Sequence, residues 1–266
     1  MADIPELFDS HTHIDFPDYD ADRAEVVARA QAAGVRRMVC VGTDVAASRI
    51  AIGIAAAHAG VYASAGIHPN HVAQFPDSDL DALASLARDP AVVAIGETGL
   101  DFFRNETPRD RQELFFHRQL ELAAETGKAF ILHSRQSGMA CLDIVEQHMK
   151  TTLGLRGVFH CFTDTKEVLL RALELGLHVG VSGIATFPKG DNVRECVPLI
   201  PADRLVLDTD CPFLTPPPHR GARNEPAHAV LIARQLSVLR GISYEQFAAE
   251  STAAAAALFG LPASVR

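Results

Sequence analysis

Short, continuous apolar runs alternate along the chain with longer segments whose apolar residues recur every three or four positions. Continuous apolar runs are typical of strands buried on both faces of a parallel sheet, and the three-to-four spacing is typical of amphipathic helices. The pattern therefore predicts eight strands separated by helical segments. The predicted strands cover residues 4–8, 35–41, 61–65, 92–95, 129–132, 157–159, 178–181 and 205–207.

A glycine stands between a helical pattern and the following strand in four of these units, at Gly34, Gly60, Gly127 and Gly176. Glycine readily adopts the left-handed conformation that ends a helix, so we expect four helix C-termini at these positions. Eight alternating units without an interdomain linker predict a single domain over residues 1–266. Its expected fold is α/β, a (β/α)8 TIM-type barrel with the active site at the C-terminal ends of the strands.

Two helix starts and one long loop can also be assigned. Thr107 precedes a proline and is expected to cap a helix that begins with that proline. Ser243 is followed three residues later by a glutamine, the spacing of a capping box that opens the last helix. The proline-rich segment 212–226 cannot form a regular helix, so we expect an ordered loop over one mouth of the barrel.

Composition narrows the possible partners. The net charge of −9 argues against an extended grip on nucleic acid, so a phosphate-bearing substrate would need a local positive site. The five cysteines are odd in number and scattered, which indicates reduced thiols and a cytoplasmic protein.

No signal peptide is expected at the N-terminus. Residues 50–67 lack formal charges but are broken at Gly60, so we interpret them as barrel core and expect no membrane span.

The most informative motif is Asp-Ser-His-Thr-His at residues 9–13. Side chains alternate along a strand, so His11 and His13 would point the same way, about 7 Å apart along the backbone. Two such imidazoles can bind a divalent cation, although a His-X-His pair alone is a weak signal.

Further candidate ligands each follow a predicted strand, at the end where barrel enzymes build their sites. A single histidine in such a place is more often a satisfied core residue, but six imidazoles and carboxylates meeting at one rim suit two divalent cations. The predicted metal ligands are His11, His13, Glu97, His133, His160 and Asp210.

Other side chains would contact the substrate. His68 follows the third strand and would bind a phosphate or donate to the leaving group; the alternative is a structural turn histidine. Arg135 suits bidentate phosphate binding, and its alternative is an ion pair with Asp101 or Asp164. Arg104 lies on an expected rim loop and is a weaker candidate.

Aromatic residues and known nucleotide motifs add little. Phe162 and Phe187 could stack on a nucleobase, although apolar packing is the favoured interpretation for both. The chain lacks a Gly-x-Gly-x-x-Gly pattern, a P-loop and a Gly-x-Ser-x-Gly pattern, so dinucleotide, nucleoside-triphosphate and serine-hydrolase chemistry are unsupported.

Motifs spread over nearly the whole chain resemble those of the TatD-type metal-dependent deoxyribonucleases, in the family's order. The resemblance implies an amidohydrolase-like barrel that binds one or two divalent ions and hydrolyses DNA phosphodiester bonds, often from a strand end. Besides residues 9–13, the motifs are Gly-Ile-His-Pro at 66–69, Gly-Glu-Thr-Gly-Leu-Asp at 96–101, Leu-His-Ser-Arg at 132–135, His-Cys-Phe at 160–162, Ser-Gly at 182–183, Asp-Thr-Asp-Cys-Pro at 208–212 and Arg-Gly-Ala-Arg-Asn-Glu-Pro at 220–226.

The resemblance also implies a role for each ligand. Glu97 would bridge the two ions, with His11, His13 and Asp210 on the first and His133 and His160 on the second. Asp210 can also reach the attacking water with its second oxygen, so it is our choice of proton acceptor; the alternative is a ligand only. Four imidazoles favour Zn²⁺ or Mn²⁺, whereas the family precedent favours Mg²⁺.

Three positions depart from the family pattern. Asp208 stands where a glutamate is usual, which would weaken a contact behind the ligands. Ala254 replaces an asparagine of the last helix and loses a capping or packing hydrogen bond. Cys211 replaces a serine or alanine, and we favour a spectator thiol over a thiolate ligand.

The leading hypothesis is a metal-dependent nuclease that acts on DNA ends or single strands through a metal-activated water, with nucleic acid as its substrate. The alternative keeps the metal site and hydrolyses a carboxylic ester or amide, such as D-aminoacyl-tRNA. A non-enzymatic scaffold would be preferred only if ligand positions were missing, and none is.

Overall fold

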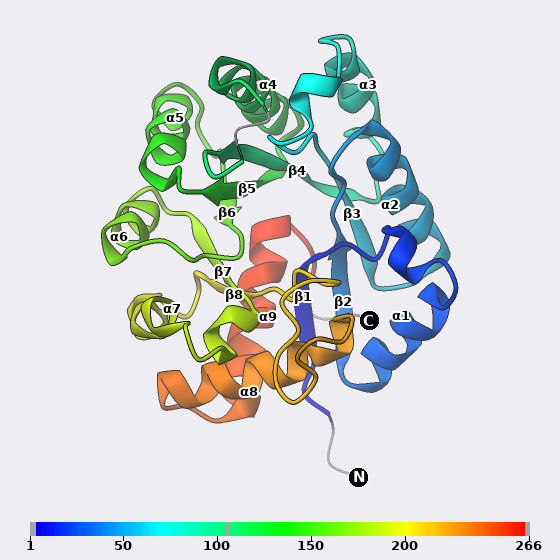
Figure 1. Cartoon of the computed structure of the whole chain (residues 1–266), viewed down its shortest axis with the longest axis vertical. Coiled ribbons are helices and arrows are strands. Elements are labelled where there is room, and N and C mark those ends of the chain that lie inside the picture. The colour runs from blue at the N-terminus through cyan, green and yellow to red at the C-terminus, as the bar shows by residue number, and fades with distance from the viewer. Residues whose placement is uncertain (1–3, 105–106, 264–266) are drawn as a thin grey trace.

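Eight parallel strands close into a barrel in a computed structural model that describes residues 4–104 and 107–263 (Figure 1). Each strand pairs with the next along the chain, and β1 pairs with β8. The predicted barrel is confirmed. The strands are β1 Leu7–Thr12, β2 Val35–Cys40, β3 Val61–Ala65, β4 Val92–Asp101, β5 Ala129–Arg135, β6 Gly157–Phe159, β7 His178–Val181 and β8 Leu205–Leu207.

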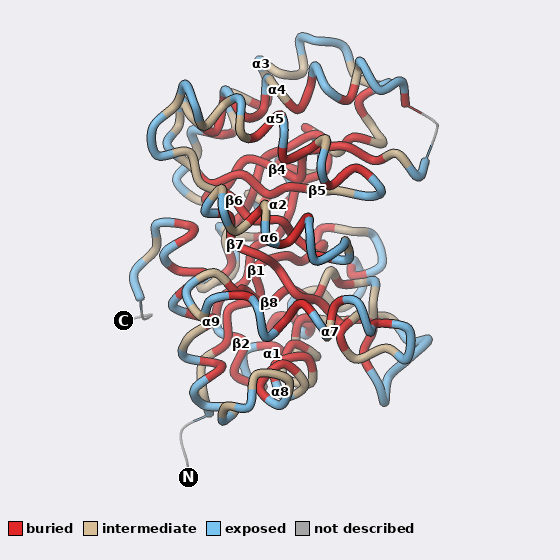
Figure 2. The backbone as a smooth tube through the Cα atoms, turned by 90° about the vertical axis from the view of Figure 1, so that its left-hand side faces the viewer, coloured by how far each residue is buried: buried red, intermediate tan, exposed pale blue. Residues whose placement is uncertain are grey.

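Helices surround the barrel, and the burial pattern follows this arrangement: the strands are buried, whereas exposed residues lie on the outer helices and loops (Figure 2). The α-helices of the described residues are α1 Arg23–Ala32, α2 Val45–Ala57, α3 Asp79–Leu86, α4 Arg109–Thr126, α5 Gly138–Thr151, α6 Lys166–Glu174, α7 Asp191–Cys196, α8 Ala229–Arg240 and α9 Tyr244–Phe259. None of them is long and apolar enough to cross a membrane.

The last helix, α9, closes the floor of the barrel. Ala254 and Leu258 pack with apolar residues from the beginnings of the strands, among them Phe8 and Val93. Ala254 is only 4% exposed. The small side chain at this position is therefore part of a close-packed floor.

Three strands extend beyond their predicted bounds, and β2 ends one residue short of its own, at Cys40. β1 begins at Leu7 rather than at residue 4 and includes His11, β4 continues to Asp101 and so contains Glu97, and β5 continues to Arg135. The apolar runs mark only the part of each strand that faces the core. Polar residues extend these strands into the site at the C-terminal rim.

Three of the four predicted helix ends are confirmed, and all four glycines have φ values between 64° and 102°, in the left-handed region (Gly34, Gly60, Gly127 and Gly176). The exception is α2, which ends at Ala57 because His58 is already extended, so Gly60 lies in the turn before β3.

Of the two predicted helix starts, one is confirmed and one is wrong. Ser243 caps α9, and its side chain accepts a hydrogen bond from the backbone N–H of Gln246. Thr107 does not cap α4, because Pro108 precedes the first helical residue. The Thr107 hydroxyl instead donates to the carbonyl oxygen of Asn70, which fastens the loop before α4 to the loop after β3.

Candidate metal centre

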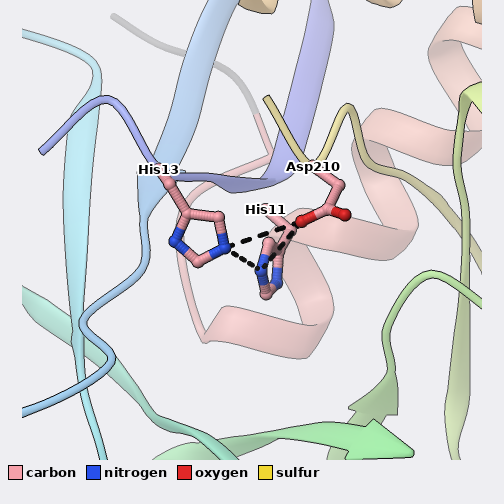
Figure 3. Close-up of side chains that lie close together, drawn as sticks. All are labelled: His11, His13 and Asp210. Carbon is pink, nitrogen blue, oxygen red and sulfur yellow. Dashed lines mark hydrogen bonds and ion pairs between the residues drawn. The ribbon is translucent and has the colours of Figure 1, made fainter. Parts of the chain in front are cut away.

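The end of β1 and the segment after β8 bring three predicted ligands together: His11, His13 and Asp210 (Figure 3). The two Nε2 atoms are 3.1 Å apart, and Asp210 Oδ1 lies 3.8 Å from that of His11 and 3.5 Å from that of His13. The backbone fixes this arrangement, because the N–H of Asp210 donates to the His11 carbonyl oxygen and the N–H of His13 donates to that of Cys211. Three potential ligand atoms thus face one point.

Glu97 lies between this group and a second one. Its Oε2 atom is 3.5 Å from His11 Nε2 and 3.7 Å from His13 Nε2. Its Oε1 atom is 2.8 Å from His133 Nδ1 and 2.8 Å from His160 Nε2. One buried carboxylate therefore faces both groups of imidazoles, one oxygen to each.

Two glycines allow Glu97 to reach this place. A Cβ atom at Gly66 would lie 2.2 Å from the carbonyl carbon of Gly96, so the residue after β3 can approach the middle of β4 this closely only without a side chain. The backbone N–H of Glu97 then donates to the Gly42 carbonyl oxygen at 3.0 Å.

Hydrogen bonds orient two of the imidazoles. His13 Nδ1 is 3.2 Å from the Val41 carbonyl oxygen, and His133 Nε2 is 3.4 Å from Asp101 Oδ2. A ring nitrogen that donates to such an acceptor leaves the other nitrogen of the neutral ring with a lone pair for a metal ion. In His13 this is Nε2, and in His133 it is Nδ1, the atom facing Glu97.

The donor set fits divalent cations. With Nδ1 of His13 as the donor, its Nε2 lone pair faces His11 Nε2 at 3.1 Å, a contact that needs a shared proton or a cation. Every ligand atom of each candidate group lies within 4.8 Å of the others. Imidazole nitrogen and carboxylate oxygen are ligands of Zn²⁺ and Mn²⁺. The groups are His11, His13 and Asp210; His11, Glu97 and His160; and His68, Glu97 and His133.

Burial and neighbouring charges shift the pKa values in this cluster in opposite directions. Burial and the nearby His160 lower the pKa of His11 to about 4. Burial disfavours the charged form of His13, but the hydrogen bond to Asp210 and the charges of Glu97 and Asp210 together outweigh it and raise the pKa to about 9. Burial raises the pKa of Glu97, but the facing imidazoles, His160 foremost, together outweigh it and hold the pKa well below its usual value. The metal-free site therefore holds protons that a cation must displace.

His68 lies closer to the ligands than the sequence indicated. Its Nε2 atom is 3.6 Å from Glu97 Oε1, and its ring centroid is 4.3 Å from that of His133. Its Nδ1 accepts a hydrogen bond from the backbone N–H of Asn70 at 3.1 Å. The neutral ring therefore carries its hydrogen on Nε2, the atom that faces the site, and can donate it to a substrate oxygen.

Arg135 lies on the wall of a pocket of about 580 Å³ that contains the ligand cluster. Its guanidinium stacks over the Phe103 ring at 4.1 Å. Within residues 4–104 and 107–263, no ion pair joins it to Asp101 or Asp164, so the alternative role for Arg135 is wrong there. Arg104 lines the same pocket.

Two carboxylates that sequence reasoning missed support the site from behind. Asp9 accepts hydrogen bonds from the Thr209 backbone N–H at 2.9 Å and from its hydroxyl at 2.6 Å, which joins β1 to the segment carrying Asp210. Asp101 was considered only as a partner for Arg135, but it contacts His133. Their positions in the sequence could have indicated this role, because Asp9 stands two residues before His11 and Asp101 ends the strand that carries Glu97.

The shorter carboxylate at position 208 is held by one of its two oxygens, because Oδ1 has no hydrogen-bond partner among the described residues. Asp208 is fully buried, and its Oδ2 accepts a hydrogen bond from the Cys161 backbone N–H at 2.8 Å. Burial raises its pKa to about 7. A Cβ at Gly180 would lie 2.3 Å from the same oxygen, so the space around this carboxylate is tightly filled. Asp208 thus still supports the backbone next to His160.

Cys211 is fully buried and belongs to none of the candidate metal groups found among the described residues, in agreement with a spectator thiol. Phe162 is 1% exposed and packs in the core, as the favoured interpretation had it. The Phe187 ring is covered by the Arg220 guanidinium at 3.7 Å.

Comparisons with known proteins agree with this geometry. The sequence model of the family described as TatD related DNase matches residues 8–260. The metal-dependent hydrolase YabD of Bacillus subtilis is 36% identical over 95% of this chain and 98% of its own. The 3′-5′ ssDNA/RNA exonuclease TatD of Erwinia amylovora is 38% identical over 96% of this chain and 100% of its own.

Among solved structures, the TatD homologue YjjV of Escherichia coli K12 superimposes with a TM-score of 0.92 and 28% sequence identity, covering 98% of this chain and 100% of that one. Together with the family match over most of the chain, this shows that the protein belongs to the TatD-related deoxyribonuclease family and is a metal-dependent hydrolase.

Proposed function

We propose that this protein hydrolyses phosphodiester bonds at the ends of single-stranded nucleic acid in the cytoplasm, with two divalent cations bridged by Glu97. The main support for the proposal is that the two oxygens of the Glu97 carboxylate face different groups of imidazoles. The names of relatives, such as the single-strand exonuclease of Erwinia amylovora, support the substrate class.

His11, His13 and Asp210 would hold the first ion, and His133 and His160 the second. Bound cations of this kind lower the pKa of a water molecule and neutralise the charge of a phosphodiester. Asp210 faces the two imidazoles with Oδ1, so we assign Oδ2 as the acceptor of the proton that the attacking water loses.

Substrate phosphate would be held by donors on the side of β3, β4 and β5. His68 offers the hydrogen on its Nε2 atom, and Arg135 and Arg104 offer guanidinium groups. These are local contacts, which reconciles a phosphate-bearing substrate with a net charge of −9.

The experiment compares metal-loaded wild type with Asp210→Asn and with Asp203→Asn, a control at an exposed aspartate in the loop before β8. The substrates are labelled single-stranded DNA and RNA and a panel of carboxylic esters and amides, including a D-aminoacyl-tRNA. Wild type and the control should release nucleotides, and Asp210→Asn should be slower by at least about 100-fold. Cleavage of esters or amides alone would refute the nuclease assignment.

A further inference from the structure

An exposed aromatic side chain stands beside the ligand cluster. Phe213 follows Asp210 by three residues, is 51% exposed and lines the pocket that holds the ligands. Its ring meets the Phe16 ring edge to face, with centroids 6.0 Å apart at 79°. Phe16 in turn stacks on the ligand His13 at 4.8 Å and 26°. An aromatic surface therefore continues from a metal ligand to the solvent.

The backbone holds Phe213 in a fixed place. Its N–H donates to the Asp210 carbonyl oxygen at 2.9 Å, and its own carbonyl oxygen accepts a bond of 2.6 Å from the side chain of the fully buried Asn224. The next residue, Leu214, has a φ of 57°, and its carbonyl oxygen lies 2.2 Å from where a Cβ of Gly183 would be. The exposed ring is thus placed by the surrounding structure before any ligand binds.

The opposite side of the pocket has a different character. Arg104 and Arg135, the only Lys or Arg side chains among the described residues that line it, follow or end β4 and β5. Phe16 and Phe213 follow β1 and β8. In an eight-stranded barrel these two pairs of strands lie across from each other. Cationic groups and an apolar aromatic face therefore flank the ligand cluster from two sides.

The arginine side of the pocket suits the phosphate of a nucleotide, and the phenylalanine side suits its base. We infer that Phe213, supported by Phe16, is a stacking platform for the nucleobase next to the scissile phosphate, which makes the substrate class an unpaired strand end. The inference rests on the proposed function. Stacking on an aromatic ring tolerates every base, because each base has a π face. A base inside a duplex has both faces covered by its neighbours, so only a frayed or single-stranded end can use the platform.

The other phenylalanines that the structure describes near this rim do not offer such a face to the pocket. Phe162 is buried, and the Phe187 ring carries the Arg220 guanidinium. Phe103 is exposed, but Arg135 covers one face of its ring and the residue does not line the pocket. Phe213 is therefore the residue whose removal should abolish recognition of the base.

The test compares a thymidine hexanucleotide with the matching hexamer of 5,6-dihydrothymidine, whose base keeps its hydrogen-bonding edge but is neither flat nor aromatic. The ratio of kcat/KM for the two substrates should be about tenfold in wild type, the size expected for one base–aromatic stack. It should fall to near one in Phe213→Ala and recover in Phe213→Trp. Leu153→Ala, at a fully exposed position of the α5–β6 loop, is the control and should keep the wild-type ratio.

A binding measurement separates this inference from the proposed function. Affinities of both hexamers for Asp210→Asn protein, measured by fluorescence anisotropy with and without the Phe213→Ala change, should show the same loss of preference without any cleavage. If wild type cleaves neither hexamer, the proposed function fails, and the binding ratio still decides the platform. The inference is overturned if Phe213→Ala still prefers the thymidine hexamer over the dihydrothymidine hexamer, or if wild type shows no such preference.

Discussion

Asp101 shows how a single side chain joins the ligand cluster to the substrate side of the pocket. Its Oδ2 atom accepts hydrogen bonds from Asn70 at 3.0 Å and from His133 at 3.4 Å. Its Oδ1 atom accepts bonds from the backbone N–H groups of Phe103 and Arg104, both at 3.0 Å. One buried carboxylate thus sets the orientation of a ligand ring and the position of the loop that carries Arg104.

Removing this carboxylate should weaken metal binding. In Asp101→Ala, His133 loses the acceptor that fixes its ring, and we expect the affinity for the second metal ion to fall about 10- to 100-fold. Titration of the metal-free protein against a competing chelator measures this. Asp81→Ala, at an exposed position in α3, is the control and should bind like wild type. Equal affinities in the two variants would contradict the role given to Asp101.

The affinity for metal should depend on pH in a defined direction. Burial lowers the pKa of both His13 and His133, but the hydrogen bonds and charges of the facing carboxylates together outweigh it and raise each pKa to about 9. The carboxylates are Asp210 and Glu97 for His13, and Asp101 and Glu97 for His133. Both rings are therefore protonated in the metal-free protein at neutral pH, and a cation must displace these protons. Raising the pH from 6 to 8 should increase the affinity about tenfold per pH unit for each displaced proton.

Calorimetry in two buffers of different ionisation enthalpy counts the protons released on binding. Release near pH 7 with an affinity that rises with pH is the expected result. An affinity that stays constant between pH 6 and 8 would show that these rings bind no protons in the metal-free site.

At the residue scale, the positions after the apolar runs were enough to predict that the six candidate ligands lie close together. Asp9 was missed because its role depends on Thr209, a partner 200 positions away that only the closed barrel brings near. His68 was predicted to contact substrate, but its approach to Glu97 and His133 also depends on the closed barrel. Contacts behind the candidate ligands join residues that are distant in sequence, so a sequence pattern alone does not reveal them.

At the scale of elements, hydrophobic pattern and glycines predicted eight strands and three of the four helix ends, whereas strand lengths were underestimated. The last residues of β4 and β5 are polar because they point into the site, and a pattern of apolar burial cannot include them. The start of α4 was misassigned because the Thr107 hydroxyl bonds to a carbonyl of another loop rather than to its own helix.

One element-scale contact concerns the floor of the barrel, where β2 contacts the segment before β1 and the segment after α9. Arg37 is 1% exposed, donates to the carbonyl oxygens of Pro262 and Ala263 at 2.6 and 2.9 Å, and lies 2.7 Å from a carboxylate oxygen of Glu6. Its guanidinium also lies over the Phe8 ring at 5.2 Å. The segment after α9 is thereby fastened to the barrel on the side away from the metal ligands.

Loss of this guanidinium should destabilise the fold without affecting the site. Arg37→Ala leaves two carbonyl oxygens without their donor and the Glu6 carboxylate without its ion-pair partner, and we expect the free energy of unfolding to fall by about 2 kcal/mol. Urea denaturation measures it. Arg36→Ala, at the adjacent exposed position of the same strand, is the control and should change stability by less than about 0.5 kcal/mol. A destabilisation of equal size in both variants would argue against the fastening role.

At the scale of the whole molecule, an acidic protein should bind its substrate through a few phosphates only. Arg104 and Arg135 can neutralise about two phosphates, so the logarithm of the affinity for single-stranded DNA should fall with the logarithm of salt concentration with a slope of about −1.4. Anisotropy titrations of the non-cleaving Asp210→Asn protein give this slope. A slope steeper than about −4 would indicate an extended basic track that the present account does not include.

The central claim is that six side chains, distant along the chain, gather two cations around Glu97. Anomalous diffraction from crystals soaked in Mn²⁺ tests it most directly. Two peaks should appear on opposite sides of the Glu97 carboxylate, one among His11, His13 and Asp210 and the other beside His133 and His160. A map without density next to Glu97, or with ions only at sites away from these residues, would contradict the account.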